Sequence, residues 1–113
     1  MTTFSSCSKD SEDLIVGEWE CYKHESRSYE SDWRVEESDD DKPILAIWKF
    51  YDDGTVEMWD NGGFVGWGCW SINGDELELT NRSDYSIEEL TSSHMILYRG
   101  NSEYQSREYF KRK

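Results

Sequence analysis

Three short glycine-containing turns constrain the fold of this chain more than any other feature. They are Asp52-Asp53-Gly54, Asn61-Gly62-Gly63 and Asn73-Gly74, and each separates two segments in which apolar and polar residues alternate. Turns of this length join antiparallel strands into hairpins, and alternation is the pattern of strands with one buried face. The region therefore predicts four consecutive antiparallel strands, at residues 44–51, 55–60, 64–72 and 75–81.

The lengths of these turns also predict which residues face each other across neighbouring strands. We interpret the first two as three-residue loops and Asn73-Gly74 as a two-residue type I′ turn. The predicted pairs are Phe50–Val56, Trp48–Met58, Lys49–Glu57, Met58–Gly66, Trp59–Val65, Trp70–Leu77 and Gly68–Leu79. All three turns agree on one inward face, formed by Trp48, Phe50, Val56, Met58, Trp70, Leu77 and Leu79.

The rest of the chain extends the same pattern. A first strand is predicted at 14–23, and the last three at 84–90, 93–99 and 102–112. Residues 26–43, between the first two strands, are predicted as a long acidic loop. The 113 residues leave room for one domain. Eight short strands joined mostly by tight turns predict an all-β fold, a small up-and-down antiparallel barrel over residues 14–113.

The formal net charge of −13 limits the partners of the chain. Nucleic acid is excluded, because binding to phosphates requires a basic face. Binding to an anionic membrane surface is disfavoured for the same reason, and no segment reaches the roughly 18 apolar residues of a membrane span. The charge is explained either by solubility alone or by a basic protein partner.

The order of the motifs resembles the lipocalin-like domain of Bacteroidota-type bacterial lipoproteins. The motifs are Leu14-Ile-Val-Gly-Glu-Trp19, Trp48-Lys-Phe-Tyr-Asp-Asp-Gly-Thr-Val56, Asp60-Asn-Gly-Gly63, Trp70-Ser-Ile-Asn-Gly-Asp-Glu-Leu77 and Tyr109-Phe-Lys-Arg-Lys113. In particular, Gly17-x-Trp19 resembles the lipocalin signature whose tryptophan closes one end of the barrel. The resemblance implies a secreted, lipid-anchored small barrel that can hold a hydrophobic molecule, with no catalytic residues.

The N-terminal segment is consistent with such an anchor. Ser5-Ser6-Cys7 resembles the end of a bacterial lipobox, in which the cysteine is lipidated and becomes the new N-terminus. Residues 1–13 are then a lipobox remnant followed by an acidic flexible tether. This interpretation predicts an outer-membrane lipoprotein of the bacterial cell envelope, periplasmic or surface-exposed, that contacts the membrane only through the lipid on Cys7. The alternative is an ordinary N-terminus that starts at Met1.

The sequence contains no catalytic motif. His24 and His94 are not associated with a serine or cysteine nucleophile motif, and no phosphate-binding glycine loop occurs. Cys21 and His24 are three residues apart, so on a regular strand they point to opposite faces and are poorly placed to share a metal ion. Cys21 is predicted to point inward and Cys69 outward, which disfavours a disulfide. We therefore expect no enzyme activity, no cofactor and no metal.

The first functional hypothesis is a pocket for a small hydrophobic ligand inside the barrel. Gly66 and Gly68 point inward and leave space beside Val56, Met58 and Leu79, so a pocket is expected to be small and close to these glycines. The alternative is that side chains fill the barrel. The candidate pocket residues are Trp19, Trp48, Phe50, Val56, Met58, Gly66, Gly68, Trp70 and Leu79.

The second hypothesis is an acidic, surface-displayed module that binds a basic protein. An outward apolar row across three strands is typical of a contact surface. It would work together with the acidic segment at 29–41, or form a weak homodimer of an otherwise monomeric chain. The opposing interpretation is that Tyr29, Trp33 and Val35 fold back and cover the row. The candidate surface residues are Tyr29, Trp33, Ile47, Trp59, Val65 and Trp67.

Overall fold

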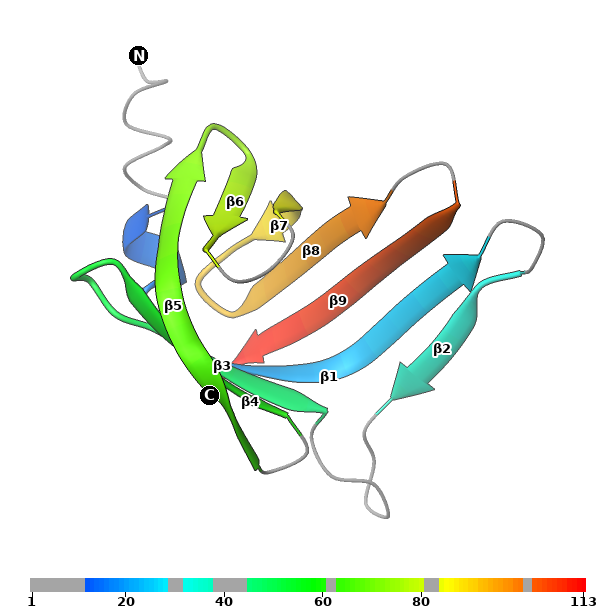
Figure 1. Cartoon of the computed structure of the whole chain (residues 1–113), viewed down its shortest axis with the longest axis horizontal. Helices are drawn as coiled ribbons and strands as arrows, with labels where there is room; N and C mark the ends of the chain where they lie inside the picture. Colours follow the sequence, from blue (N-terminus) through cyan, green and yellow to red (C-terminus); the bar gives the residue numbers. More distant parts are fainter. Residues whose placement is uncertain (1–11, 29–31, 38–44, 61–62, 81–83, 101–102) are drawn as a thin grey trace.

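Nine strands form one antiparallel sheet in the residues that the computed structural model describes (Figure 1). These residues are 12–28, 32–37, 45–60, 63–80, 84–100 and 103–113. The strands are β1 (Gly17–Ser28), β2 (Arg34–Glu37), β3 (Ala46–Phe50), β4 (Thr55–Asp60), β5 (Gly63–Asn73), β6 (Glu76–Leu79), β7 (Tyr85–Leu90), β8 (His94–Gly100) and β9 (Tyr104–Arg112).

Eight of the nine strands close into a barrel. The order runs from β1 through β3, β4, β5, β6, β7 and β8 to β9, and β9 pairs back with β1. All neighbours are antiparallel, as hairpin connections require. The predicted fold class, an all-β up-and-down barrel of about eight strands, is confirmed. No helix in the described part of the chain is long and apolar enough to span a membrane.

β2 is the strand outside the closed barrel, and it corrects the predicted loop at 26–43. β1 continues to Ser28, beyond the predicted end of the first strand, and β2 pairs with residues 23–26 of β1. β3 pairs with β1 only over residues 17–21, so β1 changes neighbour at Cys21. A β-bulge between Cys21 and Lys23 lies at this point. Figure 1 shows β8, β9, β1 and β2 side by side. Beyond Cys21, where β1 stops pairing with β3, these four strands separate from β3 and β4.

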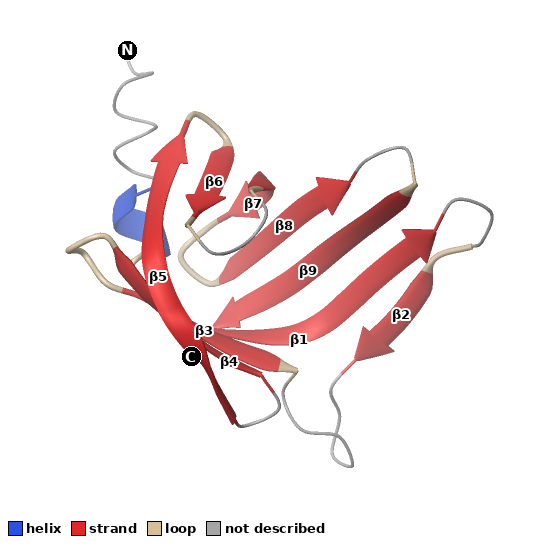
Figure 2. Cartoon of the chain, in the orientation of Figure 1, coloured by secondary structure: helices blue, strands red, loops and turns tan. Residues whose placement is uncertain are grey.

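The N-terminus of the barrel also differs from the prediction. Residues 12–15 form a helical turn rather than the start of a strand (Figure 2). Ile15 is completely buried, and its carbonyl accepts a hydrogen bond of 2.8 Å from Nε1 of the buried Trp19. The guanidinium of Arg112 lies 4.2 Å from the centre of the Trp19 ring. The turn and Arg112 therefore close this end of the barrel, which we call the closed end.

The predicted inward face is largely the core of the molecule. Its tryptophans and aliphatic residues alternate with exposed or half-buried residues along each strand, as a barrel with a packed interior requires. The buried apolar residues are Ile15, Trp19, Cys21, Trp48, Phe50, Val56, Met58, Leu77, Leu79, Tyr85, Met95, Leu97 and Phe110, with Trp70 packed against them.

The predicted pairing of β3 with β4 is confirmed at Phe50–Val56, Trp48–Met58 and Lys49–Glu57. Between β4 and β5 the pair Met58–Gly66 is confirmed, but the pair Trp59–Val65 is wrong, because Trp59 faces Phe64. Asp60 pairs with Gly63, so the loop holds two residues rather than three, and a β-bulge at Val65 restores the register.

The pairing of β5 with β6 is two residues away from the prediction. Trp70 faces Leu79, and Asn73 faces Glu76, so the turn residues are Gly74 and Asp75. Gly74 has φ of +66°, and a two-residue hairpin turn favours glycine at its first central position for this reason. A shift of two residues keeps each side chain on its face, so Trp70, Leu77 and Leu79 still point inward.

Candidate functional site

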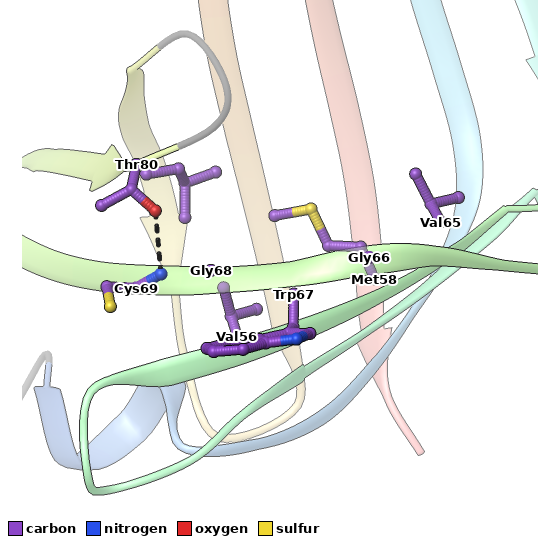
Figure 3. Close-up of a pocket in the computed structure, with 9 residues that line it drawn as sticks. Val56, Met58, Val65, Gly66, Trp67, Gly68, Cys69 and Thr80 are labelled. Carbon is purple, nitrogen blue, oxygen red and sulfur yellow. Dashed lines mark hydrogen bonds between the residues drawn. The ribbon is translucent and has the colours of Figure 1, made fainter.

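A cavity of about 290 Å³ lies beside β5. Apolar side chains from β4, β5 and β6 form most of its wall, as is usual for small-molecule sites. Figure 3 shows these residues around the ribbon of β5. They are Val56, Met58, Val65, Gly66, Trp67, Gly68, Cys69, Leu79 and Thr80.

Two glycines of β5 leave the space open. Gly66 faces Met58 and Gly68 faces Val56, so each occupies an inward position without filling it. A Cβ atom added at Gly66 would meet no other atom within 4 Å. The φ of Gly66 is +152°, a conformation that residues with a side chain rarely adopt. The backbone at the bulge therefore both requires glycine and produces the cavity.

The β-bulge adds a residue to the cavity wall that strict alternation does not place there. Val65 is the extra residue of the bulge, and it lines the cavity although it is 52% exposed. In Figure 3, Val65, Met58 and Thr80 lie on one side of the β5 ribbon, and the ring of Trp67 lies on the other. At Trp67, the β5 strand therefore separates the cavity on one side from solvent on the other.

The edge of the cavity nearest β6 is held by two hydrogen bonds. The amide of Cys69 donates to Oγ1 of Thr80 over 3.0 Å, and the amide of Thr80 donates to the carbonyl of Cys69 over 3.1 Å. The Thr80 hydroxyl therefore accepts from the backbone and keeps its own hydrogen to donate. It is the polar side chain that this cavity offers to a ligand, besides the weak donor of the Cys69 thiol.

The structure divides the sequence-predicted pocket residues into two groups. Val56, Met58, Gly66, Gly68 and Leu79 line the cavity. The four large aromatic residues do not line it, because they pack against one another and other rings nearer the closed end. Their ring contacts include Trp48–Phe110 at 4.9 Å and Phe50–Trp70 at 5.8 Å between centroids. Those four residues are Trp19, Trp48, Phe50 and Trp70.

The sequence reasoning missed four of the cavity residues. Val65 and Trp67 were assigned to an outward row and Cys69 to the outer face, and Thr80 was not considered. The sequence contains one indication of the bulge at Val65. It is the second glycine, Gly63, which follows Asn61-Gly62. Thr80 becomes a wall residue only through its bonds with Cys69 across the end of β6.

The outward row is also altered by the bulge. Ile47 faces Trp59 as predicted, but the next residue in the row is Phe64, whose ring centroid is 5.1 Å from that of Trp59. Val65 leaves the row for the cavity wall, and Trp67 continues it with 65% of its surface exposed. An exposed apolar surface on β5 therefore consists of Phe64, Val65 and Trp67.

The residues expected to cover this row lie elsewhere where the structure describes them. Trp33 lies under two guanidinium groups, with Arg107 at 5.1 Å and Arg27 at 6.0 Å from its ring centre. These arginines belong to β9 and β1, so Trp33 packs on that part of the barrel. Val35 in β2 is 49% exposed. Tyr29 lies outside the described residues, as do most of the acidic run and Cys7.

The two cysteines of the barrel differ in their surroundings. Cys21 is buried, and burial raises the pKa of its thiol to about 12, whereas Cys69 is exposed. The bulge after Cys21 brings Cys21 and His24 opposite Phe110 and Glu108, two alternate positions of one face of β9. The predicted separation of Cys21 and His24 onto opposite faces is therefore wrong. Metal ions bind the thiolate form of cysteine, and burial disfavours that form at Cys21.

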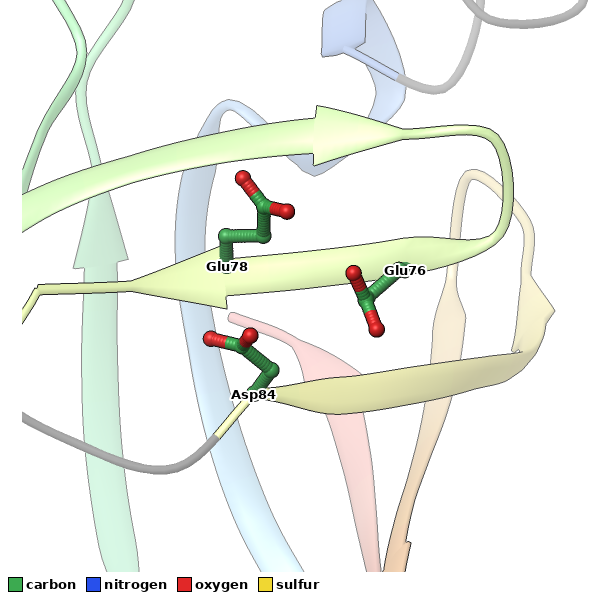
Figure 4. Close-up of side chains that lie close together, drawn as sticks. All are labelled: Glu76, Glu78 and Asp84. Carbon is green, nitrogen blue, oxygen red and sulfur yellow. The ribbon is translucent and has the colours of Figure 1, made fainter.

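An acidic cluster stands at the β6–β7 side of the barrel. The carboxylates of Glu76, Glu78 and Asp84 offer oxygens within 4.8 Å of one another (Figure 4). Desolvation, then the hydrogen bond with Glu78 and the neighbouring negative charges, raise the pKa of Glu76. The groups are exposed or half-buried, and such surface clusters are common in acidic proteins.

The comparisons with known proteins support the fold. No protein-family model matches the sequence, and no curated protein matches it. Among solved structures, the chain is similar to a lipocalin-like protein from Bacteroides uniformis, with a TM-score of 0.58 and 15% sequence identity. The match covers 88% of this chain and 99% of that one. The barrel is therefore lipocalin-like in fold.

Proposed function

We propose that this chain is a non-catalytic, lipid-anchored binding protein of the bacterial cell envelope that holds a small apolar ligand in the cavity beside β5. The observation that carries the proposal is the cavity itself, beside the inward positions of Gly66 and Gly68 on β5. A barrel of eight strands either fills its interior or holds one small molecule. Here large side chains pack into a core, and a cavity lies beside β5.

The size and lining of the cavity define the class of ligand. At about 290 Å³, it is at the lower limit of ordinary ligand sites, which suits one or two fused rings or a short alkyl chain. The wall is mainly apolar, and Thr80 can donate one hydrogen bond. The net charge of −13 disfavours anionic ligands such as fatty acids. We therefore expect a neutral aromatic or aliphatic molecule with at most one or two acceptors.

Methyl-labelled methionine provides the test. Met58 lines the cavity, whereas Met95 is completely buried in the core, so the same protein contains its own control. Titration with a neutral bicyclic compound such as indole or 2-naphthol is expected to shift the NMR signal of the Met58 methyl group and leave that of Met95 in place. Equal shifts at both, or none at saturating probe, would contradict the proposal.

A pair of glycine substitutions strengthens this test. Gly68→Val places a side chain in the cavity opposite Val56 and is expected to abolish the Met58 response. Gly63→Ala is the matched control, because its Cβ would make an ordinary 3.6 Å contact at the start of β5, outside the cavity. Binding that survives Gly68→Val would place the ligand elsewhere.

The lipid anchor is tested separately. Replacing Cys7 with serine in the natural host is expected to move the protein from the membrane fraction to the soluble fraction. A protein that stays in the membrane fraction after this change would argue against lipidation at Cys7.

A further inference from the structure

Four polar residues form one row across β8, β9, β1 and β2, the strands that lie side by side in Figure 1. In chain-to-chain order they are Arg99, Ser106, Ser26 and Arg34, and each faces the next across a pair of strands. Residues that face each other in this way lie on one face of a sheet. That face continues the inside of the barrel, because Ser106 is completely buried and Leu97, two residues before Arg99, belongs to the core. We call these four residues the polar row.

Arg99 is held in place by two contacts. Its Nε donates a hydrogen bond of 3.3 Å to Oγ of the buried Ser106, and its guanidinium lies 5.5 Å from the ring centre of Tyr85. One edge and one face of the planar group are therefore occupied. The terminal nitrogens Nη1 and Nη2 keep N–H groups that can donate to a further acceptor.

The two arginines of the polar row lack acidic partners, which is unexpected in this chain. The sequence contains 25 Asp and Glu residues against 12 Lys and Arg residues. On the other face of the same strands, Arg107 pairs with both Glu25 and Glu88. In the part of the chain that the structure describes, no ion pair joins Arg99 or Arg34 to a carboxylate. Because a half-buried charge without a counter-charge is costly, an anion from outside the chain is favoured here.

We propose that the polar row binds the phosphate group of a small molecule. Neighbouring strands are about 4.8 Å apart, so the Cα atoms of Arg99 and Arg34 are about 14 Å apart, and both side chains can extend over the serines between them. Each guanidinium can donate two parallel hydrogen bonds to a phosphate, and the hydroxyl of Ser26 can donate another. Two guanidinium groups match the charge of about −2 on a phosphate monoester better than that of a carboxylate. The inference goes beyond ligand binding in the cavity.

Two features of the chain limit the anion to a single group. The net charge of −13 repels anions at long range, but salt screens this repulsion beyond about 10 Å at 0.1 M, so the nearest groups decide binding. The next row on the same face contains His24 and Glu108, which face each other. The carboxylate of Glu108 would repel a second anionic group on that side. The polar row therefore suits one phosphate and not a polyanion such as nucleic acid.

The test uses methyl phosphate and acetate, two anions without an apolar part that could occupy the cavity. Each is titrated at physiological salt and neutral pH into the ¹⁵N-labelled full chain, and the Nε–H signals of the arginines are followed by NMR. Methyl phosphate is expected to shift the signals of Arg99 and Arg34 until they saturate, and to leave that of Arg107 in place, because its acidic partners already occupy it. No localised shift, an equal shift at Arg107, or an equal response to acetate would overturn the proposal.

Variants separate a specific site from a general effect of charge. Arg99→Gln and Arg34→Gln are each expected to weaken methyl phosphate binding by about fivefold or more, while Arg99→Lys keeps the charge without the fork and recovers only part of the loss. Arg27→Gln removes the same charge beside Ser26, on the opposite face of β1, and is expected to change the affinity by less than about twofold. An equal loss in Arg27→Gln would show a general charge effect only and overturn the proposal.

Ser106 is expected to act as a positioning residue for Arg99. Ser106→Ala removes the acceptor of the Arg99 Nε–H, so this proton should exchange faster with solvent and methyl phosphate should bind about threefold more weakly. Unchanged exchange and affinity would overturn this role of Ser106. Thermal unfolding of each variant distinguishes a lost contact from a lost fold, and the exposed Arg34 tests the site even where an Arg99 variant fails to fold.

The two proposals can fail independently. Gly68→Val fills the cavity from inside the barrel and is expected to leave the response of Arg99 to methyl phosphate unchanged. Loss of methyl phosphate binding in a folded Gly68→Val variant would show that the polar row is not a separate site and overturn its assignment.

Discussion

Arg112 is expected to be the most important single side chain for the stability of the closed end. Its guanidinium donates to three backbone carbonyls from two places in the chain: Val16 at 2.7 Å and Leu14 near the N-terminus, and Ser92 at 3.0 Å. It also stacks on Trp19. One side chain therefore connects the helical turn at residues 12–15, the loop between β7 and β8, and the end of β9.

The size of this contribution follows from the contacts. Each of these charge-assisted hydrogen bonds, two part-buried and one exposed, contributes about 1 kcal/mol, and the stacking on indole adds roughly 0.5 kcal/mol. Arg112→Met keeps the aliphatic stem over Trp19 and removes the rest, so the free energy of unfolding should fall by about 3 kcal/mol. For a chain of 113 residues this corresponds to a decrease in melting temperature of about 12 °C.

Thermal unfolding followed by circular dichroism measures this decrease directly. Lys111→Met is the matched control, because it removes an exposed cation from the neighbouring position of β9. Arg112→Lys tests the geometry, since one ammonium cannot reach three carbonyls, and it should recover less than half of the loss. If Arg112→Met melts within about 2 °C of Lys111→Met, the contacts contribute little and the reasoning is refuted.

Three further predictions concern single residues. Gly17→Ala should destabilise the fold by about 2 kcal/mol in chemical denaturation, because Gly17 has φ of +134° and its Cβ would overlap the stacked arginine. With Cys7 replaced by serine, Ellman's reagent should modify Cys69 within minutes at pH 8, while Cys21 reacts only on unfolding. The hydrogen bond with Lys113 lowers the pKa of Glu18, so this pair stabilises the fold above the ordinary carboxyl pKa. That stability should be lost as pH falls from about 4.5 through the folded pKa, and Glu18→Gln should flatten this part of a stability–pH curve.

The sequence predicted the inward face correctly because different registers produce the same alternation. A three-residue loop at 61–63 and a two-residue loop followed by a bulge at Val65 both bring Met58 opposite Gly66. A turn at Gly74-Asp75 and one at Asn73-Gly74 both send Trp70 inward. The hydrophobic pattern conflicts only with a strand register that is shifted by one residue. It therefore could not distinguish these alternatives, which keep each side chain on the same face.

The candidate site was predictable only in part for a related reason. Gly66 and Gly68 pointed to the cavity because the absence of a side chain is visible in a sequence. The position of Val65 depends on the bulge, and that of Thr80 depends on hydrogen bonds beyond the end of β6. β2 was not predicted because its pairing requires β1 to leave β3 at Cys21, which is decided by the closure of the whole sheet.

The wall that β5 contributes to the cavity is one strand thick. From Val65 to Cys69, β5 has side chains only at alternate positions, so at Gly66 and Gly68 only peptide backbone separates the cavity from the outer face of the barrel. A molecule in the cavity would contact peptide groups whose other face lies on the outside of the barrel. A shift of the strand on binding would therefore reach the outer face directly, through the backbone alone.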